Sequence, residues 1–226
     1  MENNFKQPMN QLYLKFPIKK NYLKQDFYVS SNNLEAHKLL DSFPNWPDKR
    51  INIYGPLGCG KTHLANILKE KINALIVDTQ NIDEKILELS LSHDCLIIDN
   101  FKNNLKEEFF YTLLNHLDQH NKYIIVNSQD PIQSFKIKLK DLKSRLNSFI
   151  VIGIDLPSEN LLRVIISKSF SDKQIELNNR NLEYIIKNID RSYTKISKFI
   201  SDVDNESLSS GKMINIKLIK KILSNE

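Results

Sequence analysis

A glycine-rich loop followed by a lysine and a threonine is the feature that most constrains this chain. Its residues read Gly55-Pro56-Leu57-Gly58-Cys59-Gly60-Lys61-Thr62 and fill every required position of the GxxxxGK[ST] pattern. An apolar run at 51–54 predicts a buried strand before the loop, and apolar residues at helical spacing predict a helix after it. Such a loop binds phosphate through backbone N–H groups and the helix N-terminus. The pattern therefore predicts binding of a nucleoside diphosphate or triphosphate. The alternative is a chance glycine turn followed by a surface lysine.

Side chains at two places complete the predicted site. Lys61 is expected to reach the β- and γ-phosphates, and the Thr62 hydroxyl is expected to bind Mg²⁺. Further along the chain, the apolar run 96–98 predicts a buried strand that ends in the carboxylate of Asp99. Asp99 would hold the Mg²⁺ through water. Thr62 and Asp99 are therefore the predicted metal-binding residues.

The residue after Asp99 is Asn100, where a hydrolysing enzyme of this architecture usually has an acid. An amide cannot accept a proton from water, and loss of a general base costs about 10²–10⁴ in rate. Glu107 and Glu108 on the following predicted helix are either solvated surface residues or substitutes for this base. The sequence thus favours a nucleotide-gated switch over an efficient motor.

Composition is that of an ordinary globular protein. The 226 residues are 41% hydrophobic and 26% charged, and apolar stretches such as 149–154 are too short to span a membrane. The first residues lack the basic and apolar regions of a signal peptide, and Cys59 and Cys95 make no disulfide framework. The net charge of +5 is spread along the chain and is weak support for nucleic-acid binding. We therefore expect a cytoplasmic protein without a membrane segment.

The pattern along the chain divides it into three parts. Residues 1–22 are polar and irregular, residues 23–156 alternate strand and helix patterns, and residues 157–226 are expected to form a small all-helical domain. Alternation predicts an α/β core, a five-stranded parallel sheet flanked by helices. The strand candidates lie at 51–54, 74–78, 95–99, 123–127 and 149–154, with helices near 61–73, 83–91, 105–119 and 138–146. Ser158 is expected to cap the first C-terminal helix, and further helices are expected at 178–189, 193–205 and 215–224.

Six segments together resemble one known family. They are Asp26–Ala36, Tyr54–Leu64, Ile98–Asn100, Val126–Pro131, Leu142–Leu146, and Arg191 with the amphipathic helix 196–203. The chain is similar to the AAA+ family of DnaA-type bacterial replication initiators, and most similar to its short regulatory homologues of the Hda type. The motif that ends in Asn100 resembles this regulatory branch, because initiators carry two acids there. The resemblance covers nearly the whole chain and implies an AAA+ core followed by a helical lid.

The resemblance implies a site for ADP or ATP with Mg²⁺. Phe27 and Val29 correspond to residues that lie against the adenine. The loop residues that would contact the nucleotide are Gly55, Pro56, Gly58, Cys59, Gly60, Lys61, Thr62 and His63. Asn127 occupies the sensor 1 place, where an amide holds the γ-phosphate or its attacking water; the alternative is a strand-end turn residue. Gln129 departs from the acid that the family has nearby.

Two arginines also match family positions. Arg145 lies in the box that carries the arginine finger, which acts in trans on the nucleotide of a neighbouring molecule. A surface salt bridge is the alternative for Arg145. Arg191 occupies the sensor 2 place, where it would begin a lid helix and close the lid onto the nucleotide. A solvated arginine at the start of a helix is the alternative for Arg191.

The segment 11–16 resembles the short peptide by which bacterial proteins dock on the replicative sliding clamp. Leu12 and Leu14 with Phe16 are its apolar residues, and Gln11 would form hydrogen bonds at the rim of the clamp pocket. An edge strand with alternating apolar residues is the alternative. The position of the segment ahead of this AAA+ module favours the clamp.

These expectations combine into one preferred function. The chain is expected to be a nucleotide-bound regulator that docks on the sliding clamp and promotes hydrolysis of the ATP bound to a DnaA-type initiator. Its own ATPase activity is expected to be weak or absent, and its association with DNA is expected to be indirect. Copies of the chain could also form a homo-oligomer through the same head-to-tail contact. The sequence ends after the lid, so the helix-turn-helix domain of an initiator is expected to be absent. The alternatives are a DNA-binding initiator-like or helicase-loading ATPase and a small-molecule P-loop kinase.

Overall fold

The computed structural model of the chain describes residues 27–210 and 214–224, apart from the side chain of Ser210. These residues form two compact units that divide between Pro157 and Ser158. The expected clamp-docking residues Gln11, Leu12, Leu14 and Phe16 lie outside the described residues.

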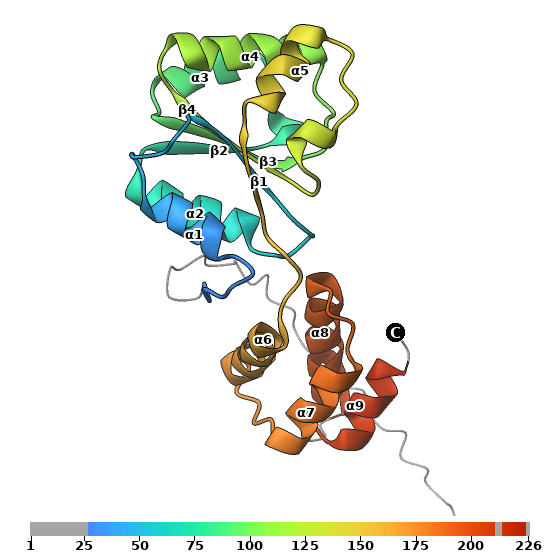
Figure 1. Cartoon of the computed structure of the whole chain (residues 1–226). Helices are drawn as coiled ribbons and strands as arrows, with labels where there is room; N and C mark the ends of the chain where they lie inside the picture. Colours follow the sequence, from blue (N-terminus) through green and yellow to red (C-terminus); the bar gives the residue numbers. More distant parts are fainter. Residues whose placement is uncertain (1–26, 211–213, 225–226) are drawn as a thin grey trace, which may run out of the picture. The chain divides into compact units, whose positions relative to one another are not determined.

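The first unit is built on a sheet of five parallel strands in the order β2-β3-β4-β1-β5 (Figure 1). The strands are β1 (Arg50–Tyr54), β2 (Ala74–Asp78), β3 (Cys95–Phe101), β4 (Tyr123–Ser128) and β5 (Ile150–Gly153). Strands of a parallel sheet covered on both faces read as continuous apolar runs, and in β3 and β4 nearly every side chain is buried. The predicted five-stranded parallel sheet is confirmed, with small shifts at the strand ends.

Helices cover both faces of this sheet. They are α1 (Leu34–Asp41), α2 (Lys61–Lys71), α3 (Ile86–Leu91), α4 (Glu107–Gln119) and α5 (Lys140–Asn147), with the 3-10 turns η2 (Thr79–Asn81) and η3 (Ile132–Ser134). Figure 1 shows α1 and α2 on one face and α3, α4 and α5 on the other. In α4 the buried residues Phe110, Leu113, Leu114 and Leu117 recur at helical spacing. They pack against β3 and β4 side chains in the main core.

The sequence pattern does not predict α1. This helix has only eight residues, of which Ala36 and Leu40 are buried. The turn before it is instead fixed by Asn33, whose side chain accepts from the Ser30 N–H at 2.8 Å and donates to the Tyr28 carbonyl at 3.0 Å. Local polar contacts therefore set the start of this segment, and the helix itself is short.

The second unit is entirely helical in its described residues. It contains α6 (Glu159–Asp172), α7 (Asn179–Asn188), α8 (Tyr193–Ser210) and α9 (Ile216–Leu223). These helices enclose their own apolar core, in which Phe170 and Phe199 are fully buried. The Ser158 side chain accepts a hydrogen bond from the Leu161 N–H, which confirms the predicted cap of α6. No helix in the described part of the chain is long and apolar enough to cross a membrane.

A buried asparagine joins the adjacent strands β1 and β4. The side chain of Asn52 in β1 has 0% exposure and donates to the Val126 carbonyl and the Ser128 hydroxyl of β4, both at 2.8 Å. Its Oδ1 accepts from the Ile132 N–H of η3, also at 2.8 Å. All hydrogen-bonding groups of this amide except one lone pair are therefore used, which makes its burial favourable.

Replacing Asn52 with alanine is expected to lower the free energy of unfolding by about 2–3 kcal/mol, because buried polar partners lose their hydrogen bonds. Urea denaturation followed by circular dichroism measures this change. Asn104→Ala, at an exposed position, is the control and should stay within about 0.5 kcal/mol of wild type. Equal stability of the two variants would contradict the assigned role of Asn52.

Candidate functional site

The glycine-rich loop lies between β1 and α2, at the carboxyl end of β1. Gly60 precedes α2 with a φ of +102°, a left-handed conformation that other residues rarely adopt. A Cβ atom at Gly60 would lie 2.9 Å from Cε2 of Phe27, so this position has no room for a larger residue. The Phe27 ring also meets the His63 ring edge-on at 5.3 Å between centroids. Phe27 thus packs against the loop, whereas Val29 is 37% exposed.

The ammonium group of Lys61 lies over the loop that precedes it. Its Nζ donates to the carbonyl oxygens of Gly55 at 2.7 Å and Pro56 at 3.0 Å, and the residue is 8% exposed. The Cys59 sulfur lies 3.5 Å from the same Nζ. Burial raises the pKa of the Cys59 thiol, although the lysine charge partly offsets this. The loop therefore presents a positive charge beside a protonated, buried thiol.

Three side chains meet at the carboxyl ends of β3 and β4. The Thr62 hydroxyl donates to Oδ2 of Asp99 at 2.7 Å, and the Asn127 amide donates to Oδ1 at 3.0 Å. Thr79, which follows β2, donates its hydroxyl to the Asp99 main-chain carbonyl at 2.9 Å. The structure thus brings together Thr62, Asp99 and Asn127, and it adds Thr79, which the sequence pattern did not single out.

This group of oxygens has the chemistry of a Mg²⁺ site. Hydroxyl and carboxylate oxygens are hard ligands, and Mg²⁺ in such sites keeps several water molecules and binds the substrate phosphates. The Oδ1 atom of Asn127 is buried and has no hydrogen-bond partner among the described residues. A water molecule bound to the metal would supply a donor to this atom. Thr62 and Asp99 therefore fit Mg²⁺, and the free Oδ1 atom of Asn127 could accept a hydrogen bond from a water molecule there.

Asn100 points away from this group. The residue is exposed, has a φ of +55° and lies within the register shift between β3 and β4, which spans Ile98 to Phe101. Its amide donates to Oδ2 of Asp78 in β2 at 2.6 Å. This hydrogen bond, followed by one from the Gln80 N–H, lowers the pKa of the Asp78 carboxyl. Asn100 therefore joins the ends of β3 and β2 and does not face Thr62 and Asp99.

Glu107 has a structural partner as well. Its carboxylate accepts from the backbone N–H groups of Lys138, at 3.0 Å, and Leu139, at 2.7 Å. These hydrogen bonds lower the pKa of the Glu107 carboxyl. Glu107 thus fixes the segment that leads into α5, and Glu108 beside it is exposed.

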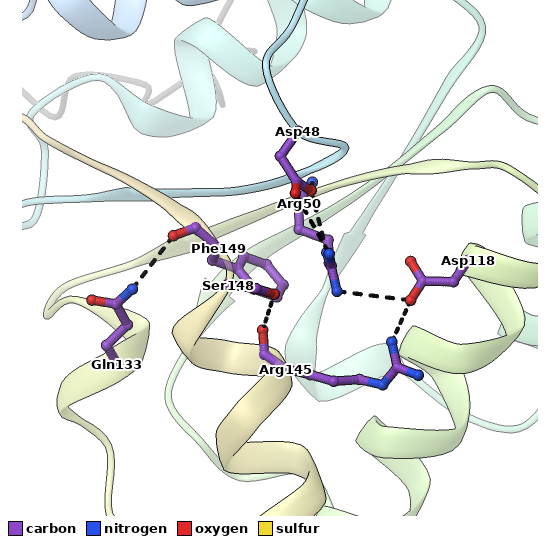
Figure 2. Close-up of polar contacts among 7 residues, drawn as sticks. All are labelled: Asp48, Arg50, Asp118, Gln133, Arg145, Ser148 and Phe149. Atoms are coloured by element: carbon purple, nitrogen blue, oxygen red, sulfur yellow. Dashed lines mark hydrogen bonds and ion pairs between the residues drawn. The ribbon is translucent and has the colours of Figure 1, made fainter.

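Arg145 lies in α5 and forms an ion pair with Asp118 of α4 (Figure 2). Nη1 of Arg50, the first residue of β1, lies 3.8 Å from the same Asp118 oxygen. The glycine-rich loop follows the other end of β1, and a strand rises about 3.3 Å per residue. Arg145 therefore lies near the amino-terminal end of β1, whereas Lys61 follows its carboxyl end. The structure does not bring Arg145 to the glycine-rich loop of its own molecule.

Arg191 lies in the second unit. The expectation that Arg191 begins a helix is wrong, because α8 begins at Tyr193 and the Ser192 carbonyl accepts its first hydrogen bond, from Ile196. The Arg191 guanidinium lies 3.5 Å from Glu159, the first residue of α6. Its contact with a nucleotide stays a prediction.

The sheet order, the loop after β1 and the helical unit that follows are those of the AAA+ fold. No family model matches the chain. Its AAA+ fold agrees with solved structures. The crystal structure of domain III of the replication initiation protein DnaA from Thermotoga maritima has a TM-score of 0.75 at 19% identity, covering 93% of this chain and 98% of that one. AMPPCP-bound DnaA from Aquifex aeolicus has a TM-score of 0.66 at 21% identity, covering 83% and 66%.

The chain is homologous to the chromosomal replication initiator protein DnaA over most of its length. The Nautilia profundicola protein is 29% identical over 81% of this chain and 47% of its own length. The Borreliella afzelii protein is 26% identical over 97% of this chain and 49% of its own length. The chain thus spans about half the length of these curated relatives.

Replacing Asn100 with alanine is expected to raise the pKa of Asp78 toward its usual value of about 3.9, because the largest cause of the lowering is removed. A lowered pKa in the folded state stabilises the protein above the unfolded pKa, and this contribution is lost as the pH falls through the folded pKa. Carbon-13 NMR titration of the Asp78 carboxyl measures the shift, with Asn104→Ala as the control. An unchanged pKa in Asn100→Ala would remove Asn100 as its cause.

Proposed function

We propose that the chain is a cytoplasmic, nucleotide-bound AAA+ regulator of DNA replication initiation that acts on a DnaA-type initiator. The observation that carries this proposal is the convergence of Thr62, Asp99 and Asn127 beside the loop that bears Lys61. The homology to DnaA supports the biological setting. The Aquifex aeolicus relative is described as bound to AMPPCP, which supports an adenine nucleotide as the ligand.

In this proposal each residue of the site has one task. Backbone N–H groups of the loop would hold the phosphates of ADP or ATP, and Lys61, which now donates to two carbonyl oxygens, would donate to phosphate oxygens. Thr62 and Asp99 hold Mg²⁺, which would neutralise charge on the phosphates. Phe27 and Val29 would contact the adenine, and Arg191 would bind the nucleotide as the sensor 2 residue.

The contacts of Asn100 and Glu107 support slow hydrolysis by this chain itself. Asn100 is hydrogen-bonded to Asp78, and Glu107 is occupied by the backbone before α5. Neither residue faces Asp99, so neither is placed to take a proton from a water molecule near the phosphates. The bound nucleotide then acts as a switch that sets the shape of the protein for its partner.

The chain would act on its partner through Arg145. This residue lies near the amino-terminal end of β1, away from the glycine-rich loop of its own molecule. That position suits a head-to-tail contact with the nucleotide of a neighbouring molecule. There the guanidinium would stabilise charge on the initiator's ATP during hydrolysis. The same contact would also allow copies of this chain to associate.

The proposal includes docking on the sliding clamp through Gln11, Leu12, Leu14 and Phe16. The support for this step is the motif in the sequence and its place ahead of the AAA+ unit. Docking would bring the chain to DNA indirectly, next to the initiator.

Replacing Lys61 with alanine is expected to abolish measurable binding of ADP and ATP, because the positive charge at the β-phosphate is lost. Isothermal titration calorimetry with and without Mg²⁺ measures the affinity. Lys71→Ala, at the far end of the same helix, is the matched control and should bind normally. Wild-type affinity in Lys61→Ala would exclude the loop as the nucleotide site.

Replacing both Gln11 and Leu12 with alanine is expected to abolish binding to the purified sliding clamp while leaving the melting temperature unchanged. Pull-down and differential scanning fluorimetry measure the two properties. A collapse in stability would mean that the segment is an edge strand of the fold and that the clamp assignment is wrong.

Replacing Arg145 with alanine is expected to lower stimulation of ATP hydrolysis by a DnaA-type initiator about 10³–10⁵-fold, the usual effect of losing an arginine finger. The measurement is hydrolysis of labelled ATP bound to the initiator in the presence of clamp loaded on DNA. The variant should keep its own nucleotide affinity and clamp binding. Stimulation equal to wild type would leave Arg145 as a surface ion-pair residue.

A further inference from the structure

The guanidinium group of Arg145 is hydrogen-bonded at Nη1, whereas its Nε and Nη2 edge is not. Its Nη1 donates to Asp118 (Figure 2), and its Cζ lies 5.6 Å from the centre of the Tyr111 ring. The Nε and Nη2 atoms have no hydrogen-bond acceptor among the described residues, and the side chain remains 31% exposed. A guanidinium has five N–H donors, so most of them remain available to an incoming anion.

Asp118 is itself fixed by a second arginine. Nη1 of Arg50 lies 3.8 Å from the Asp118 oxygen that Arg145 contacts, and Nε of Arg50 lies 3.2 Å from Asp48. Figure 2 shows these four side chains as one row in which negative and positive charges alternate. Asp118 therefore has a defined position between two guanidinium groups.

The backbone on both sides of the pair is also fixed. Asp118 lies near the end of α4 and Arg145 near the end of α5, and both helices contribute buried residues to the same apolar core. Leu117 and Leu146, which neighbour the two charged residues in sequence, are each 1% exposed. The distance between the Asp118 and Arg145 main chains is thus set by packing and not by the ion pair.

We propose that Asp118 is a positioning residue for Arg145. It binds one edge of the guanidinium so that the Nε and Nη2 edge is presented to the phosphate oxygens of a neighbouring molecule's nucleotide. A long side chain that is already ordered loses less freedom on binding, and two parallel N–H donors match a phosphate geometrically. This inference rests on the proposed function, because it requires Arg145 to act in trans.

The geometry favours positioning over competition. A carboxylate that occupied the Nε and Nη2 edge would have to leave before a phosphate could bind there. Asp118 contacts Nη1 instead, and Tyr111 lies against the guanidinium. A phosphate can therefore bind while both contacts remain.

Asp118→Asn, which keeps the shape of the side chain and removes its charge, tests this role. Stimulated hydrolysis of the initiator's ATP is expected to fall about 10- to 100-fold, the effect of misplacing a catalytic group. The Asp118→Asn/Arg145→Ala double variant should be no slower than Arg145→Ala alone, because both changes remove the same interaction.

Asp141→Asn is the matched control, since Asp141 is an exposed carboxylate of α5 with no ion pair to Arg145 among the described residues. It should stimulate like wild type.

A second measurement follows the side chain itself and needs no initiator. Nitrogen-15 relaxation of the Nε–H group should show Arg145 more ordered than the exposed Arg180 in wild type, and this order should fall in Asp118→Asn. An Arg145 as mobile as Arg180 in wild type would overturn the positioning role.

The two assays separate the ways in which the inference can fail. Unchanged or increased stimulation by Asp118→Asn, with Arg145→Ala inactive, would overturn the positioning role and leave the proposed function standing. Full stimulation by Arg145→Ala would overturn both.

Discussion

The carboxylate of Asp99 is the point on which the candidate site depends. It accepts one hydrogen bond from Thr62 of α2 and another from Asn127 of β4, so it joins three segments that are far apart in sequence. The strand order brings these segments together, because β4 lies between β3 and β1, and β1 leads into the loop and α2. A buried carboxylate without such donors would be costly, so the polar contacts and the sheet order support each other.

Much of this arrangement can be predicted from the sequence. The loop is a local pattern of glycines, lysine and threonine, and the apolar runs at β3 and β4 mark strands whose carboxyl ends carry Asp99 and Asn127. Parallel strands place such ends at one edge of a sheet. The pairing of these residues therefore follows from periodicity and topology together.

The rest depends on contacts that no local pattern contains. The direction of Asn100 follows from a register shift after Ile98, and the role of Glu107 follows from its contact with backbone 138–139. The partner of Arg145 is Asp118 on another helix, and an exposed Asp carries no sequence signal of being paired. In each case the sequence predicts the helix or strand on which the residue lies, but not the atom that its side chain contacts.

The Asn52 amide has a consequence for how the molecule can change shape. By bonding to β4 and η3 at once, it ties the strand that carries Asn127 to the strand that ends in the loop. β1 and β4 therefore form a single rigid block, and neither strand can slide past the other without breaking several buried hydrogen bonds. If the proposed nucleotide site is occupied, a change there would therefore reach the rest of this unit through its helices and loops, and not through sliding of β1 against β4.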